Sequence, residues 1–322
     1  MLLILKGVSE ERVKIAIVGV GAMGTLIACF LHRAGYTSWL LDDKSEQVDT
    51  IRQEGLTVED ADGTHRIPFH TVTTEPEVIG QVDLIIIAVK AYDTEQAMSG
   101  ALPLVGDETV VLTLQNGLYN LETIAGIVGK NRVLGGVTAH GATRLGCGHI
   151  RHAGSGETVI GSLAGEQRTQ LTGVCELLNA AGIRTTTTTD VTGTIWSKLI
   201  INAAINPLTA LTRLTNGEII ECAELLDVQK RVTEEACAVA ATQGITIHYA
   251  SPVEKVKDVC RATAPNQSSM LQDILNGKKT EIDYINGAIV AEGTACGVST
   301  PYNQILTRLV KALEIQGSPD AE

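Results

Sequence analysis

Short runs of aliphatic and β-branched residues recur along the first third of the chain, separated by stretches with a helical pattern of apolar positions. The run at 82–89 is almost continuously apolar, which is typical of a strand covered on both faces. Strands that alternate with helices at this spacing predict a parallel, doubly wound α/β sheet. The expected strands are 13–18, 39–41, 82–89 and 109–114, with a helix at 25–33 that ends at Gly35.

The pattern of residue types along the chain changes twice after that region. Glycine and threonine dominate 133–189, where we interpret the Thr185–Thr189 run as the last strand of the sheet. Beyond Val191 the pattern is helical, and a chain of 322 residues is long enough for two domains. We therefore predict a Rossmann domain at 1–189 and an all-α substrate-binding domain at 190–322. The expected helices are 193–206, 217–243, 252–262, 267–276, 281–296 and 301–316.

A glycine-rich segment, Gly19-Val20-Gly21-Ala22-Met23-Gly24, follows the first expected strand and opens the first expected helix. Gly-x-Gly-x-x-Gly has little specificity alone, but this context is that of a dinucleotide-binding loop. In such loops the first glycine makes the turn, the second admits the pyrophosphate, and the third lets helix and strand pack closely. The alternative is a glycine-rich turn without a ligand.

Asp42 lies 23 residues after Gly19, at the end of the second expected strand. A carboxylate there accepts hydrogen bonds from a ribose 2′-hydroxyl and repels a 2′-phosphate, so it favours NAD(H). Lys44 partly offsets this charge, and Asp43 leaves the register open. A solvated acidic turn is the alternative.

Lys198, Asn202 and Asn206 follow one another at intervals of four, so they share one face of a helix. Leu, Ile and Ala surround them, and polar groups on a buried helix are costly unless they are paired or line a cavity. The alternative is a lysine that reaches solvent and two amides that cap neighbouring elements. Pro207 is expected to bend or end this helix.

Two further polar segments are 266–273 and 280–287. Read locally, Ser268 or Ser269 is an N-cap, and Thr280 is another with Glu281 in its first turn.

Composition and charge exclude several classes of protein. The net charge of −12 argues against nucleic acid or an anionic membrane as a partner. No apolar run reaches 18 residues, so no membrane span is expected. The seven cysteines include no Cys-x-x-Cys pair, which favours reduced thiols and a cytoplasmic location. Residues 1–12 are expected to be a ragged extension, because Glu10, Glu11 and Arg12 are wrong for a signal peptide.

The combined motifs resemble the ketopantoate reductase (2-dehydropantoate 2-reductase) family over nearly the whole chain from Val13. The two late segments are the most specific part of the resemblance. The matching segments are Gly19–Gly24, 89–91, 115–117, Lys198 with Asn202 and 206–210, 216–218, 268–273 and 280–287.

This resemblance implies a role for each matching residue. Lys198 would be the general acid that protonates the ketone oxygen, and Glu281 would hold the substrate hydroxyl nearby. Lys90 and Asn116 would lie beside the cofactor. The substrate would be lined by Asn202, Asn206, Asn216, Asn266 and Ser269, with Ser269 at its carboxylate. The cofactor-binding residues would be Gly19, Gly21, Ala22, Met23, Gly24, Asp42, Lys90 and Asn116.

The implied activity is reduction of ketopantoate to (R)-pantoate in pantothenate and coenzyme A biosynthesis, without a metal. Family members that use NADPH tend to have an arginine where this chain has Asp42. We place NADP(H) ahead because the family is the broader indication, with NAD(H) as a serious alternative. His140, His149 and His152 are interpreted as structural, and a homodimer is possible. The competing functions are a related 2-oxo-acid reductase or D-2-hydroxyacid dehydrogenase, and a cofactor-binding regulator without turnover.

Overall fold

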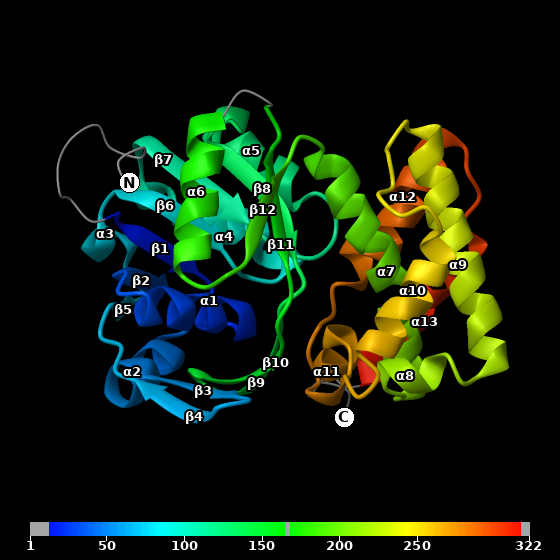
Figure 1. Ribbon diagram of the computed structural model, residues 1–322, viewed down its shortest axis with the longest axis horizontal. Coiled ribbons are helices and arrows are strands. Elements are labelled where there is room, and N and C mark those ends of the chain that lie inside the picture. The colour runs from blue at the N-terminus through cyan, green and yellow to red at the C-terminus, as the bar shows by residue number, and fades with distance from the viewer. Residues whose placement is uncertain (1–12, 165–167, 317–322) are drawn as a thin grey trace. The chain divides into compact units, whose positions relative to one another are not determined.

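The computed structural model describes residues 13–164 and 168–316, which form two compact units. The first unit holds the described residues up to Gln115 together with Tyr119–Val191. The second holds Asn116–Leu118 and the described residues from Thr192 onward. The first is α/β and the second is helical, so the predicted fold class is confirmed (Figure 1). The extension expected at 1–12 lies outside the described residues.

Eight strands form the main sheet of the first unit, in the order β12-β11-β8-β7-β6-β1-β2-β5. Most neighbours are parallel, but β11 runs antiparallel to β8, so the expectation of a wholly parallel sheet is wrong there. No crossover helix joins these two strands among the described residues, so the chain returns beside β8 in the opposite direction. The strands are β1 (Ile15–Val18), β2 (Ser38–Leu41), β5 (Val72–Thr73), β6 (Val82–Ile87), β7 (Val105–Thr113), β8 (Val133–Thr138), β11 (Thr158–Ser162) and β12 (Thr185–Thr188).

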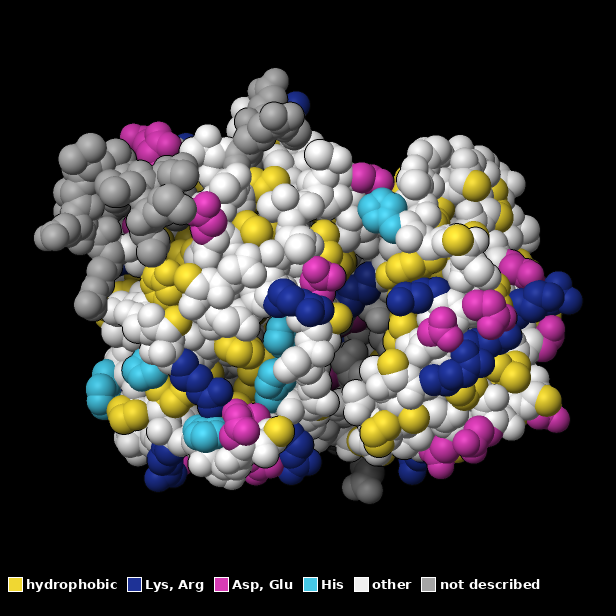
Figure 2. All heavy atoms as spheres, viewed as in Figure 1, with side chains coloured by type: hydrophobic (Ala, Val, Ile, Leu, Met, Phe, Trp, Pro, Cys, Tyr) yellow, Lys and Arg dark blue, Asp and Glu magenta, His cyan; other side chains and the backbone are white. Residues whose placement is uncertain are grey.

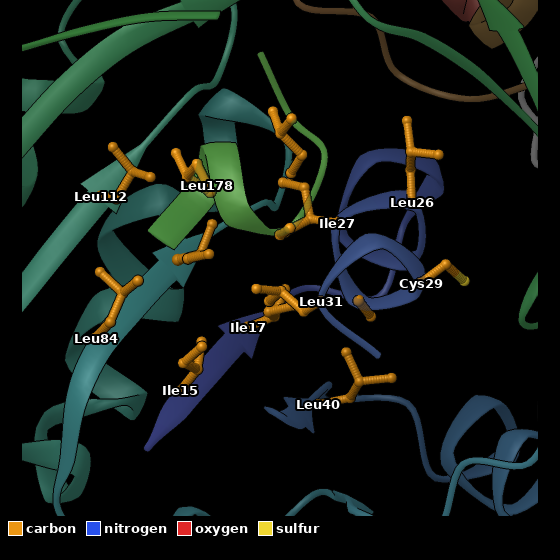
Figure 3. Close-up of a cluster of buried hydrophobic side chains, with 14 of the residues drawn as sticks. Ile15, Ile17, Leu26, Ile27, Cys29, Leu31, Leu40, Leu84, Leu112 and Leu178 are labelled. Carbon is orange, nitrogen blue, oxygen red and sulfur yellow. The ribbon is translucent and has the colours of Figure 1, made fainter. Parts of the chain in front are cut away.

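The core of this unit lies on both faces of the sheet. On one face Ile15 and Ile17 pack with side chains from α1 (Ala22–Arg33) and α6 (Arg168–Ala180), as Figure 3 shows. The alternate side chains of β6, Ile85 and Ile87, are just as buried. Helices α4 (Thr94–Gly100) and α5 (Asn120–Val128) pack against β6 and β7. Burial on both faces explains the continuous apolar run that predicted β6.

A second, four-stranded sheet in the order β4-β3-β10-β9 packs against α1, and the sequence pattern did not predict it. Its strands are mostly polar and only partly buried, so the alternation that marks a half-buried strand is weak. His140 precedes this sheet, and its Nδ1 lies 3.1 Å from Nε2 of His152. These strands are β3 (Leu56–Asp60), β4 (Gly63–Ile67), β9 (Gly141–Gly146) and β10 (His149–Gly154); α2 (Ser45–Glu54), α3 (Pro76–Ile79) and three 3₁₀ turns, η1 (Ala91–Asp93), η2 (Leu102–Leu104) and η3 (Lys130–Arg132), complete the unit.

The second unit is built from helices, and two of them have the predicted bounds. These are α10 (Pro252–Ala262) and α13 (Pro301–Gln316). The expected helix 217–243 is broken into α8 (Asn216–Ile219) and α9 (Ala223–Thr242). The region expected as 281–296 begins with the 3₁₀ turn η4 (Ile282–Tyr284) before α12 (Asn286–Cys296), and α11 (Ser269–Leu275) is slightly shorter than expected.

The first long helix of this unit, α7 (Val191–Thr212), contains Pro207 in its interior. The expectation that the helix ends at Pro207 is wrong, because it continues for five residues to Thr212. Side chains, including one from α12, donate to the backbone carbonyls around the proline.

The exposed faces of α9 and α10 alternate acidic and basic side chains, as Figure 2 shows. Among the described residues, no helix is long and apolar enough to cross a membrane. All seven cysteines are free thiols.

Candidate functional site

The glycine loop joins β1 to α1 at the point where the order of the parallel strands reverses. β1 pairs with β2 on one side and with β6 on the other, which makes this edge the switch point of the sheet. A Cβ on Gly24 would lie 2.1 Å from the carbonyl oxygen of Gly19, so the third glycine is required for close packing inside the loop. Gly19 has a φ of +95° and lies against Val89 at the end of β6.

Gly21 is required by nothing in the protein itself. Its φ is −76°, which any residue adopts, and a Cβ there would meet only the Ala88 carbonyl oxygen, at 4.0 Å. The residue precedes α1, whose first backbone N–H groups have no acceptor within the helix and attract an anion. The space beside Gly21 and the donors of Ala22 and Met23 therefore fit a pyrophosphate.

Asp42 closes β2 and is bound to the same loop. Its Oδ2 accepts hydrogen bonds from the Val20 N–H at 2.8 Å and from Gln47 Nε2 at 3.1 Å. Its Oδ1 accepts from the Lys44 N–H at 3.1 Å. Asp43 is exposed, so the structure resolves the register in favour of Asp42. These contacts fix a carboxylate, not a solvated acidic turn, at the end of the second strand.

Gln47 belongs to the surroundings of the glycine loop and was not predicted from the sequence. It is 4% exposed, and its Nε2 also donates to the Val20 carbonyl at 2.6 Å. It thereby fixes both the loop and Asp42. The only sequence signal is a glutamine at a core position of α2, which is ambiguous without the structure.

Lys90 and Asn116 both follow strands of the sheet, as predicted. Lys90 is partly buried and directly precedes η1. Asn116 belongs to the second unit, where its Oδ1 accepts from Asn202 Nδ2 at 3.4 Å. The next residue, Gly117, has a φ of +87°, and a Cβ there would lie 2.6 Å from the Tyr284 carbonyl oxygen. That carbonyl accepts the Leu118 N–H at 2.9 Å, so the segment 116–118 packs against the 280–287 segment.

Lys198 and Glu281 are the charged pair of the helical unit. Lys198 lies on α7 and is partly buried, and Glu281 is 6% exposed directly before η4. Burial lowers the pKa of Lys198 from 10.5 to about 8, while the negative charge of Glu281 acts to raise it. A lysine with this pKa is largely protonated at neutral pH and transfers its proton far more readily than an exposed lysine does.

The amides that follow Lys198 on α7 take different positions. Asn202 is partly buried and contacts Asn116, whereas Asn206 is 7% exposed. Asn202 and Asn116 thus come together from segments more than 80 positions apart in the chain. The shared polar face of Lys198, Asn202 and Asn206 stays a prediction of the sequence.

The remaining predicted residues gather around two loops of the same unit. The Asn216 N–H donates to the Asn266 carbonyl at 2.9 Å, and Asn216 Nδ2 donates to Thr263 Oγ1 at 2.9 Å. Ser268, and not Ser269, is the N-cap of α11, since its Oγ accepts the Leu271 N–H at 3.1 Å. Ser269 is exposed and its side chain is left for another role.

Two polar residues near this cluster were not predicted. Thr209 Oγ1 lies 2.6 Å from Ser268 Oγ and joins α7 to α11, and Thr263 anchors Asn216. The signal for Thr209 was its place in the 206–210 segment of the family resemblance. Thr280 accepts from the Ile282 N–H at 3.2 Å and donates to Glu314 Oε1 at 2.6 Å, so it forms a turn before η4. Within the described ranges no group of three or more metal-ligating side chains is found.

A glycine loop fitted to a dinucleotide and a buried lysine beside a carboxylate define a class of protein: nicotinamide-dependent oxidoreductases that act on a carbonyl or its alcohol. The sequence profile described as "Ketopantoate reductase PanE/ApbA" matches residues 15–165. The profile "Ketopantoate reductase PanE/ApbA C terminal" matches residues 190–314. The chain belongs to the ketopantoate reductase family.

Comparison with individual proteins agrees. The chain is 36% identical to the 2-dehydropantoate 2-reductase of Halobacterium salinarum, over 94% of this chain and 100% of that one. A PanE/ApbA family ketopantoate reductase from Ralstonia eutropha superimposes with a TM-score of 0.86 at 31% identity, covering 94% of this chain and 99% of the other. D-mandelate dehydrogenase in complex with NADH and anilino(oxo)acetate superimposes with a TM-score of 0.89 at 30% identity, with the same coverage. A nicotinamide cofactor and a small-molecule substrate follow for this chain.

Proposed function

We propose that this protein reduces 2-dehydropantoate (ketopantoate) to (R)-pantoate with a nicotinamide cofactor, in pantothenate and coenzyme A biosynthesis. The observation that carries the proposal is Lys198, buried beside Glu281 with its pKa lowered to about 8, in a chain of the ketopantoate reductase family. The cofactor supplies a hydride to the carbonyl carbon. The protein supplies a proton to the carbonyl oxygen.

Lys198 is proposed as the general acid of the reduction. Negative charge develops on the ketone oxygen as the carbon is reduced, and a nearby ammonium stabilises that charge before it transfers its proton. Glu281 accepts a hydrogen bond from the substrate hydroxyl and keeps Lys198 more protonated than burial alone allows. Ser269 binds the carboxylate. The other proposed substrate-binding residues are Asn202, Asn206, Asn216 and Asn266.

The cofactor-binding residues are proposed to be those of the glycine loop together with Asp42, Lys90 and Asn116. Gly19, Gly21 and Gly24 shape the loop, and the N–H groups of Ala22 and Met23 bind the pyrophosphate. We further propose NAD(H) as the preferred cofactor, which reverses the order expected from the family. A carboxylate fixed by Val20, Lys44 and Gln47 accepts a ribose hydroxyl and repels a 2′-phosphate.

The substrate is tested by steady-state kinetics of the purified full chain with ketopantoate, 2-oxoisovalerate and phenylglyoxylate. Ketopantoate carries the hydroxyl that Glu281 is proposed to bind, so its kcat/KM is expected to be highest by at least about tenfold, the usual minimum for a site that pairs a substrate hydroxyl. A kcat/KM for ketopantoate no better than for the other two acids contradicts the proposal.

The cofactor is tested by the ratio of kcat/KM for NADH and NADPH in the wild type and in Asp42→Ala. The wild type is expected to prefer NADH, and the variant is expected to narrow that preference, because one charged hydrogen bond is lost and one repulsion removed. A wild type that prefers NADPH reinstates the order expected from the family.

A D-2-hydroxyacid dehydrogenase is the second candidate function. It is favoured by the likeness to D-mandelate dehydrogenase with NADH and by the carboxylate of Asp42. With this second function, Lys198 of this chain would act as the same general acid on a 2-oxo acid with an aromatic or branched tail. The kinetic comparison of phenylglyoxylate with ketopantoate separates the two functions.

The homodimer and the cytoplasmic location stay predictions of the sequence. Sedimentation equilibrium of the purified chain tests the first, and fractionation of the source cells tests the second.

A further inference from the structure

A buried series of hydrogen-bonded polar side chains ends on α7, the helix that carries Lys198. None of its members has a role in the family resemblance or in the proposed reaction. It runs from Glu235 on α9 through Asn303 on α13 to Asn286 at the start of α12. Asn286 and Asn303 are both 0% exposed. Burying an amide costs free energy unless its polar atoms are hydrogen-bonded. The hydrogen-bonded series Glu235–Asn303–Asn286 is therefore a candidate for a specific role.

The starting point is the proline inside α7. Pro207 has no N–H, so the carbonyl of Ala203, four residues earlier, cannot accept its regular helical hydrogen bond. Asn286 Nδ2 donates to that same carbonyl at 3.0 Å. Two neighbouring carbonyls also receive side-chain donors: Gln229 Nε2 lies 3.5 Å from Ala204 O, and Thr209 Oγ1 lies 2.8 Å from Asn206 O. The Asn286 amide thus replaces the one helical bond that Pro207 cannot donate, and two further side chains add donors beside it.

The direction of every bond in the chain is fixed from its far end. The carboxylate of Glu235 accepts the backbone N–H groups of Tyr302 and Asn303, at 2.9 and 3.0 Å. Its Oε2 also accepts from Asn303 Nδ2 at 2.7 Å, and a carboxylate can only accept. Asn303 must therefore present its Oδ1 to Asn286 Nδ2, which lies 3.0 Å away. Asn286 then has one remaining N–H, and that N–H points to Ala203 O.

Asn286 keeps this orientation at a cost. Its Oδ1 is buried and has no hydrogen-bond partner among the described residues. Turning the amide over would place this oxygen against two acceptors, Asn303 Oδ1 and Ala203 O, so the two donated bonds outweigh the unpaired acceptor. Asn286 is held as a double donor.

The backbone carbonyl at which this series of hydrogen bonds ends, that of Ala203, indicates its role. Ala203 lies between Asn202 and Asn206 and five residues after Lys198 on the same helix. We propose that Asn286 is a positioning residue: it closes the hydrogen-bond gap left by Pro207 and so holds the Asn202–Asn206 turn of α7 in register with Lys198. Glu235 and Asn303 set its orientation. The proposal rests on the proposed function only in taking Lys198, Asn202 and Asn206 as residues that face the substrate.

The test is a double-mutant cycle in the full-length protein with Asn286→Ala and Pro207→Ala. In the wild-type background, Asn286→Ala is expected to raise KM for the 2-oxo acid about 10- to 100-fold, since small misplacements of binding groups have effects of this size. Pro207→Ala restores an N–H for Ala203 O. In that background the same Asn286→Ala substitution is expected to change KM by less than about threefold. Kd for the nicotinamide cofactor is expected to stay unchanged throughout.

Urea unfolding of the same four proteins, without substrate, measures how much the hydrogen bond to Ala203 O stabilises the fold, independently of the reaction. The loss of urea midpoint caused by Asn286→Ala should be smaller when Pro207 is replaced. Glu235→Gln serves as a milder variant that is expected to fold: it keeps the shape of the side chain but lets Asn303 turn over, and should raise KM in the same sense as Asn286→Ala. Equal effects of Asn286→Ala in both backgrounds, in KM and in urea midpoint, overturn the proposal.

The outcomes also separate this proposal from the proposed function. A protein that reduces phenylglyoxylate in preference to ketopantoate contradicts the proposed substrate but leaves the cycle intact, with KM measured for the acid that is reduced. A protein that reduces ketopantoate but shows no coupling between positions 207 and 286 contradicts the positioning role alone.

Discussion

The two units carry their candidate binding groups in opposite ways. The glycine loop of the first unit is made of backbone: three glycines and a helix N-terminus within the range 19–24, with one carboxylate bound to a loop N–H. The candidate groups of the second unit are side chains from separate segments: Asn202 contacts Asn116, and the charge of Glu281 acts on Lys198.

This difference decides what each part tolerates. A backbone cradle depends on the absence of side chains, so adding a single methyl group damages it. A side-chain cluster depends on particular functional groups, and on helices that hold them at fixed positions. A substitution in one part should therefore leave the other part intact, and the two can be tested separately.

The largest effect is expected from Lys198→Ala. Removal of the general acid should lower kcat by about 100-fold or more, the usual range for such a residue, with Kd for the cofactor unchanged. Steady-state kinetics and a fluorescence titration with NADH measure the two quantities. Lys230→Ala, a change at an exposed lysine of α9 paired with Glu234 at 3.7 Å, is the matched control and should behave as the wild type. A Lys198→Ala protein with normal turnover would instead favour a cofactor-binding regulator.

The second-largest effect concerns the glycine loop at 19–24, and two of its glycines, Gly21 and Gly24, are compared. Gly21→Ala adds a methyl group in open space, so unfolding of the cofactor-free protein should change by about 1 kcal/mol or less, the size of an altered helix N-cap. Affinity for NADH should nevertheless fall by about tenfold or more, because the methyl group occupies the approach of the pyrophosphate.

Gly24→Ala is the matched variant and should fail differently. Its Cβ meets a backbone carbonyl at 2.1 Å, so the loop must shift and the protein should lose about 1–3 kcal/mol of stability, as for other overpacked sites. Urea unfolding and calorimetric titration of both variants separate the two kinds of loss. If Gly21→Ala binds NADH like the wild type, the loop does not hold the pyrophosphate as proposed.

The sequence predicted most of the first unit, and physical reasons account for what it missed. Local signals mark β1, the glycine loop and β6: an apolar run, a glycine spacing, a strand buried on both faces. The small sheet β4-β3-β10-β9, which packs against α1, has no such signal, because its strands are mostly polar. The pairing of β11 with β8 depends on the hairpin between them, which is a property of tertiary structure.

In the second unit the sequence predicted candidate site residues but not how the helix that carries them is held. Lys198, Asn202 and Glu281 were found from helical spacing and from the family resemblance. The continuation of α7 beyond Pro207 was not, because the carbonyl freed by Pro207 is bonded by Asn286, a residue 83 positions from Ala203. Local propensity reads Pro207 as a stop, and only a distant partner changes that outcome.

The smallest effect tests whether Glu281 tunes Lys198. Reduction requires the ammonium form of Lys198, whose pKa in the folded protein is about 8. As pH rises through this value the acid is lost, so kcat/KM for the 2-oxo acid should be level below about pH 7 and should fall about tenfold per unit well above pH 8. The oxidation of the 2-hydroxy acid needs the neutral amine, so its kcat/KM should rise about tenfold per unit below about pH 7 and level off above pH 8.

Glu281→Gln sharpens this profile. The negative charge of Glu281 is the cause that raises the pKa of Lys198, so its removal leaves burial unopposed and must move the break in kcat/KM to lower pH. At pH 8 the variant should therefore lose more activity than at pH 6, in addition to a loss at all pH values from the missing bond to the substrate hydroxyl. The ratio of the two rates isolates the effect of the Glu281 charge on Lys198, since the loss of the bond to the substrate hydroxyl lowers both rates by the same factor. A break that stays in place, or moves to higher pH, would show that the charge of Glu281 does not act on Lys198. The helical unit would then owe its reactivity to burial alone.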